Sequence, residues 1–256
     1  MSWPISADIR STFSTLFTSR RDRLVVLGLV VLAAVVSLTE LVATQLFSVL
    51  ILPGSERATG EVVALVALFF AVYGGLRLVN FAREMYRINV FERALTQSVG
   101  LTPVKDSWRW AMAIEVTTLL STVGRIVVVT AACTVFAPLF GLGVIVVVLM
   151  TGVALSVIFR RQLRAQREFR QLQLARKPAS NATRVRSRVR AGEIGSLFAY
   201  FGIVLLIGLL VGLTFADLVP PGTAFVLFVA LRMMGQMLTD IAKGLMRYVR
   251  ARAFSE

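Results

Sequence analysis

Histidine is absent from the chain, and cysteine occurs once, as Cys133 within an apolar run. Without histidine the chain lacks the usual catalytic triads, most zinc sites and haem ligation. One cysteine can form neither an intrachain disulfide nor a cysteine metal site, so we expect Cys133 to serve in packing. No nucleophile–base constellation is visible either. We therefore expect a protein that is not an enzyme, with no catalytic residue, no metal and no cofactor in this chain.

Charged residues are also scarce, at 16% of 256 residues, whereas hydrophobic residues make up 57% and the mean hydropathy is +0.77. This composition leaves too few polar side chains to cover a soluble domain of this length. A single helix over the apolar run 126–159 would be ~51 Å long, well beyond a bilayer core. We expect Pro138, Gly141 and Gly143 to divide it into a hairpin. The other long uncharged runs span 24–39, 62–76, 194–216 and 218–231.

These runs predict an all-α polytopic membrane protein whose six transmembrane helices form one domain over residues 24–256. A different kind of segment precedes them, residues 1–23, in which apolar side chains recur at helical spacing from Ile5 to Phe17. We expect a short amphipathic helix on the inner membrane surface, with a frayed terminus as the alternative. The six spans are expected near 24–52, 61–95, 107–137, 142–177, 186–217 and 221–252.

The net charge is +14, which in a soluble domain would indicate nucleic-acid binding. Here the basic residues gather instead between the apolar runs, before residue 24, between 88 and 109, between 160 and 190, and after 243. The loops on the other side hold one basic residue, Arg57. The positive-inside rule then places both termini in the cytoplasm and the chain in the cell (inner) membrane. We expect the lipid bilayer, and no nucleic acid, as its partner.

The densest basic segment, residues 160–190, is expected to form the cytoplasmic face. Its first part contains no helix breaker before Pro178, so the helix is predicted to continue out of the membrane. We expect the arginines of this face to contact a partner protein or anionic lipid headgroups. They are Arg160, Arg161, Arg164, Arg167, Arg184, Arg186, Arg188 and Arg190.

Four charged residues fall near the middle of the predicted spans instead. Counted from the outer turns, Arg125 and Arg232 lie at a depth of ~18 Å, Glu40 at ~20 Å and Arg77 at ~24 Å. A charge at such depth costs a few kcal/mol, which makes each residue a functional candidate. One interpretation is structural, with Glu40 paired to one arginine while Arg77 snorkels. The other is a polar cavity in which three arginines against one carboxylate bind an anionic substrate or lipid headgroup.

Gly208 and Gly212 form a Gly-x-x-x-Gly pattern in the fifth span. Small residues at this spacing allow two membrane helices to approach closely. Such matches also arise by chance in glycine-rich helices, so we expect a role in helix packing, with dimerisation as one use.

Four segments together show a familiar pattern of helix lengths and polar interruptions. Residues 37–43 place an acidic residue mid-way along the first span, and Pro53 follows it. Residues 79–95 and 159–174 carry the second and fourth spans into a basic segment. The last segment runs from 221 through a mid-helix arginine at 232 to Arg252. These segments resemble the six-helix transmembrane half of ABC exporters, and residues 1–23 would correspond to the elbow helix of that family.

The resemblance implies a permease-like subunit that forms a homo- or heterodimer and works by alternating access. The phosphate-binding spacing Gly-x-x-x-x-Gly-Lys-Ser/Thr does not occur in the sequence, so we expect the ATPase to be a separate ATP-binding subunit. The connections 95–108 and 176–193 are also shorter than the coupling regions of the family. The alternative is a degenerate, non-transporting scaffold or assembly subunit of a larger complex. An ion-coupled transporter is less favoured because intramembrane carboxylates are few.

Overall fold

The computed structural model describes residues 4–17, 19–51, 59–96, 103–174 and 181–255. Six helices in these ranges are long and apolar enough to cross a membrane, and a shorter one precedes them. The predicted all-α polytopic membrane fold is therefore confirmed. The predicted loop residues Arg57 and Pro178 lie outside the described ranges. The helices are α1 (Pro4–Leu16), α2 (Arg20–Ile51), α3 (Thr59–Thr96), α4 (Pro103–Phe136), α5 (Pro138–Leu174), α6 (Asn181–Phe215) and α7 (Pro221–Ser255).

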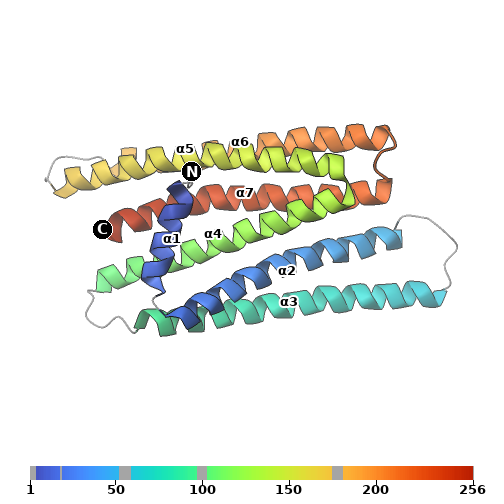
Figure 1. Ribbon diagram of the computed structural model, residues 1–256, viewed down its shortest axis with the longest axis horizontal. Coiled ribbons are helices and arrows are strands. Elements are labelled where there is room, and N and C mark those ends of the chain that lie inside the picture. Colours follow the sequence, from blue (N-terminus) through green and yellow to red (C-terminus); the bar gives the residue numbers. More distant parts are fainter. Residues whose placement is uncertain (1–3, 18, 52–58, 97–102, 175–180, 256) are drawn as a thin grey trace.

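Helix α7 is the centre of the molecule, and α3 lies at its edge. Half of the most apolar stretch of α7 is buried, against 6% of the corresponding stretch of α3. Helix α7 packs against α2, α4, α5 and α6, whereas α3 packs mainly along α2. We call α4 to α7 the central bundle and α2 with α3 the helix pair (Figure 1).

Both described termini lie toward one end of the molecule, and the short turns α4–α5 and α6–α7 lie at the other (Figure 1). We call these the basic end and the turn end. Helix α4 runs diagonally, from beside the helix pair at the basic end to α5 at the turn end (Figure 1).

The seam between α5 and α6 is closely packed through glycine. A Cβ atom added to Gly202 would lie 2.5 Å from Val147 Cγ1, and one added to Gly195 would lie 2.8 Å from Leu155 Cδ2. Neither position can take a larger side chain without moving its neighbour. Because lipid tails are as apolar as leucine, such close approach is what holds membrane helices together.

Two turns explain the sharp reversals at the turn end. Ala137 alone separates α4 from α5, and Pro138 begins α5, where a missing N–H costs nothing. The fourth span thus begins at 138 instead of near 142. Helix α6 ends in a Schellman motif: Asp217 has a φ of 55°, and Leu218 N donates to Leu213 O at 3.0 Å. Pro221 then starts α7.

Helix α1 crosses the basic end (Figure 1), and buried contacts join this part of the chain to both the helix pair and the central bundle. Phe17 is fully buried, with its ring centroid 5.8 Å from that of Phe91 in α3. The hydroxyls of Thr12 and Tyr248 form a buried hydrogen bond of 2.8 Å between α1 and α7. Arg23 closes the connection to α2 by donating to the carbonyl of Phe17 at 2.5 Å. The short N-terminal helix therefore packs on protein along the side that the sequence identified as apolar.

Candidate functional site

The four charged residues predicted at mid-depth line a single cavity of about 710 Å³. Glu40 comes from α2, Arg77 from α3, Arg125 from α4 and Arg232 from α7. The cavity lies between the helix pair and the central bundle, and we call it the central cavity. Four helices thus bring together residues that the sequence could place only at similar depths.

The central cavity is lined by stripes of residues one helical turn apart, because residues four apart share a helix face. The stripe on α3 is aromatic and ends in a charge, with Phe69, Tyr73 and Arg77. The stripes on α2 and α7 mix apolar and polar side chains. They comprise Glu40, Ala43, Thr44 and Phe47 of α2, and Phe225, Val229, Arg232, Met233, Gln236, Met237 and Asp240 of α7.

Arg125 connects α4 to α2 across the cavity wall. Its Nε donates to Ser37 Oγ at 2.6 Å, and its Nη2 lies 3.9 Å from Glu40 Oε2. The side chains of Arg125 and Glu40 remain 32% and 33% exposed, so the ion pair contributes about 0–1 kcal/mol. The contact favours the structural interpretation for these two residues.

The other two arginines form no ion pair with any described residue. Arg77 Nη2 donates to the hydroxyl of Tyr73 at 3.1 Å, and its guanidinium lies 5.4 Å from the centroid of that ring. Arg232 is exposed in the cavity wall. Since a guanidinium carries five donors, both side chains retain hydrogen-bonding capacity toward a ligand.

A second carboxylate, Asp240, lines the central cavity, although the sequence did not assign it to the site. Gln236 and Asp240 follow Arg232 at intervals of four, which places all three on one face of α7. That spacing is the signal that identifies them. The cavity therefore sets three arginines against two carboxylates, a smaller positive excess than the sequence indicated.

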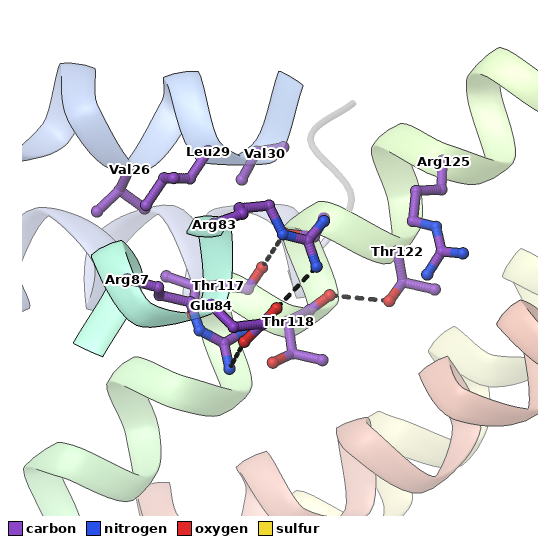
Figure 2. Close-up of a pocket in the computed structure, with 11 residues that line it drawn as sticks. Val26, Leu29, Val30, Arg83, Glu84, Arg87, Thr117, Thr118, Thr122 and Arg125 are labelled. Carbon is purple, nitrogen blue, oxygen red and sulfur yellow. Dashed lines mark hydrogen bonds and ion pairs between the residues drawn. The ribbon is translucent and has the colours of Figure 1, made fainter. Parts of the chain in front are cut away.

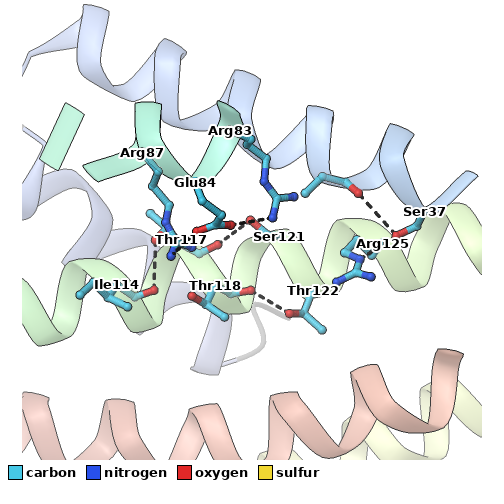
Figure 3. Close-up of polar contacts among 11 residues, drawn as sticks. Ser37, Arg83, Glu84, Arg87, Ile114, Thr117, Thr118, Ser121, Thr122 and Arg125 are labelled. Atoms are coloured by element: carbon cyan, nitrogen blue, oxygen red, sulfur yellow. Dashed lines mark hydrogen bonds and ion pairs between the residues drawn. The ribbon is translucent and has the colours of Figure 1, made fainter. Parts of the chain in front are cut away.

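A smaller cavity of about 100 Å³ lies closer to the basic end, between α2, α3 and α4 (Figure 2). Glu84 accepts hydrogen bonds of 2.7 Å from Arg83 and from Arg87, which form a compact charged cluster on α3. Helix α4 faces this cluster with hydroxyl side chains that donate to its own carbonyls one turn earlier (Figure 3). These side chains are Thr117, Ser121 and Thr122.

Arg125 lines the small cavity as well as the central one. Polar side chains therefore continue along α4 from the Glu84 cluster to the middle of the molecule. Guanidinium groups bind anions through charge-assisted hydrogen bonds, and aromatic walls contact apolar groups. This arrangement suits an amphipathic anion. Among the described residues, no three His, Cys, Asp or Glu side chains lie close enough together to hold a metal ion.

The predicted basic face divides into three groups. Exposed side chains follow α5, and a second group lines a groove of about 630 Å³ between α5 and α6. Arg188 belongs instead to a cavity beside Arg247, which forms an ion pair of 2.7 Å with Glu115. Arg184 lies in α6, with its side chain outside the described part. The exposed group is Arg160, Arg164 and Arg167, and the groove holds Arg161, Arg186 and Arg190.

Gly208 and Gly212 lie on an exposed face of α6, and a Cβ atom on either would meet no atom within 4 Å. In the part of the chain that the structure describes, they pack against no other helix. The close approach inside the chain uses Gly195 and Gly202 instead, seven residues apart on the same helix.

No protein-family model matches the sequence, and no curated protein matches it. The class of this protein therefore rests on its fold and its cavities. The chain is a multi-pass, all-α membrane protein, and its described residues include six helices long and apolar enough to span a membrane and a short N-terminal helix.

Proposed function

We propose that the chain is the permease-like membrane subunit of a transporter of the ABC-exporter type, driven by an ATPase on a separate polypeptide. The central cavity is the observation that carries the proposal. At about 710 Å³ it is large enough for a small organic molecule, and it combines free guanidinium donors with aromatic walls. Charged residues within membrane spans face the interior of the protein or a water-filled cavity, where they mark substrate and ion pathways.

The substrate class follows from the lining. Arg77 and Arg232 offer donors without a carboxylate bound to them in the described part of the chain. Phe47, Phe69 and Phe225 supply apolar surface beside them. We assign an amphipathic organic anion to the cavity, with alternating access as the mechanism and the helix pair moving against the central bundle.

The basic end faces the cytoplasm in this proposal, and the membrane is the cell (inner) membrane. Arginines are concentrated there, as the positive-inside rule requires. Helix α3 makes little contact with the rest of the chain, since 6% of its apolar stretch is buried. This supports a dimer in which α3 packs against a second copy of the chain or against a related chain. This same feature favours the second candidate, a non-transporting scaffold or assembly subunit that binds a larger complex through α3.

Two experiments separate the candidates. The first is purification in mild detergent, where the transporter reading predicts an equimolar chain that carries a phosphate-binding loop and hydrolyses ATP. Recovery of the protein in an assembly without such a chain would favour the scaffold.

The second experiment is efflux of an anionic amphipathic dye from cells that express the chain with its partner. Arg125→Ala and Arg232→Ala should abolish efflux while membrane insertion stays normal. Arg21→Ala, which changes an exposed arginine at the start of α2, is the control and should leave efflux unchanged. Normal efflux by both cavity variants would contradict transport through this cavity.

A further inference from the structure

The groove between α5 and α6 at the basic end is a separate site of about 630 Å³. Its polar part is formed by Arg161 of α5 together with Arg186 and Arg190 of α6. Among the described residues, no carboxylate lines the groove. None of the three arginines forms an ion pair with a described residue, whereas Arg247 in the neighbouring cavity is paired with Glu115. The three guanidinium groups of the groove are therefore available to bind an anion.

The floor of the groove is fixed by hydrogen bonds between the two helices. Gln162, which is nearly buried, donates from Nε2 to the carbonyl and to the hydroxyl of Ser187, each at 3.3 Å. The other side of its amide, Oε1, is buried without a hydrogen-bond partner in the described part of the chain. Ala191 keeps the floor open because its side chain is small. The groove thus combines cationic donors with a floor held in place by hydrogen bonds between α5 and α6.

The groove has a polar and an apolar end. Helices α5 and α6 are antiparallel, and Gln162 lies beside Ser187, so Ile158 and Ile194 lie on the side toward the membrane. Arg186 lies on the side of the basic end. Beyond Ile194, exposed Leu197 and Phe198 continue the apolar surface along α6. A free phosphate would use only the arginines, whereas a phospholipid matches the whole length of the groove.

We propose that this groove binds an anionic phospholipid, with the arginines on the phosphate of the headgroup and an acyl chain along Ile158 and Ile194. Basic pockets between membrane helices near the cytoplasmic surface bind anionic headgroups in this way. The proposal does not depend on transport, because the groove shares no lining residue with the central cavity.

The test is native mass spectrometry of the purified protein in detergent with phosphatidylglycerol or phosphatidylcholine added. We expect bound phosphatidylglycerol to exceed bound phosphatidylcholine. The variant Arg161→Gln/Arg186→Gln/Arg190→Gln should lower phosphatidylglycerol affinity by more than about tenfold, since each arginine near the headgroup contributes about fivefold. The matched control is Arg160→Gln/Arg164→Gln/Arg167→Gln, which removes the same charge from the exposed side of α5 and should retain the affinity within about twofold.

A second variant tests the shape of the groove without changing its charge. Ile194→Trp should fill the apolar end and displace the lipid, while thermal unfolding shows that both it and the arginine variants remain folded. Equal loss of lipid in the groove and control variants would overturn the proposal, because binding would then follow surface charge alone. Displacement of phosphatidylglycerol by inorganic phosphate at millimolar concentration would also overturn it, in favour of a soluble phosphate compound.

Discussion

The central bundle and the helix pair are built on different principles. Within the bundle, α5, α6 and α7 meet through glycine notches and fully buried side chains such as Leu231 and Phe140. In the helix pair, α3 packs mainly along α2, and only 6% of its apolar stretch is buried. The polar cavity occurs where these two parts meet, and not inside the bundle. Helix α7 thus packs closely on one face and lines the cavity with another, whereas α3 lines the cavity while packing little against the rest of the chain.

The largest expected effect separates the cores of the two parts. Leu231→Ala removes a fully buried side chain of the bundle, and Leu76→Ala removes a side chain of α3 that is 6% exposed. We expect Leu231→Ala to cost about 2 kcal/mol, the low end for such changes because unfolded helices remain in lipid. Leu76→Ala should cost less than half as much, since Leu76 lies outside the clusters of buried hydrophobic residues, one of which contains Leu231. Unfolding in mixed detergent measures both, and equal costs would show that the helix pair is as tightly packed as the bundle.

A second pair of variants tests the seam of the bundle. Gly202→Leu would collide with Val147, and we expect a loss of about 1–3 kcal/mol from overpacking. Gly208→Leu is the matched control on the same helix, because no atom lies within 4 Å of its Cβ position. It should leave the monomer unchanged. Thermal unfolding of both proteins is the measurement, and a stable Gly202→Leu protein would contradict the close approach of α5 and α6.

A smaller effect is expected from the contact that joins the helix pair to the bundle. A double-mutant cycle with Glu40→Gln and Arg125→Gln should give a coupling free energy of about 0.5–1 kcal/mol, because the pair is 3.9 Å apart and partly exposed. A coupling of several kcal/mol would indicate a dehydrated pair and argue against an open cavity.

Much of the fold follows from the order of apolar runs and breaks in the sequence. Six spans, a short N-terminal helix and the hairpin near Pro138 are all visible there, because helix length and proline position are local properties. The depth of Glu40, Arg125 and Arg232 follows from counting along each helix, which explains why the site residues lie in one cavity.

The sequence could not predict which face each helix turns toward its neighbours. The exposed position of Gly208 and the packing role of Gly202 follow from the face that α6 turns toward α5. The groove residues Arg161, Arg186 and Arg190 separate from the other arginines for the same reason. Asp240 was recoverable from its spacing of eight residues after Arg232, but only once that face was known to line the cavity.

The most direct test of the central claim is the reactivity of a cysteine placed in the cavity. In a Cys133→Ala background, Thr44→Cys lies in the cavity wall, and Val42→Cys lies two residues away on an exposed apolar face. Vesicles of both orientations are treated with membrane-impermeant thiol reagents of negative or positive charge. We predict that Thr44→Cys reacts from one side, about fivefold or more faster with the anionic reagent, given the excess of arginine. Val42→Cys should not react. An unreactive Thr44→Cys, or faster reaction with the cationic reagent, would contradict a water-filled, anion-selective cavity.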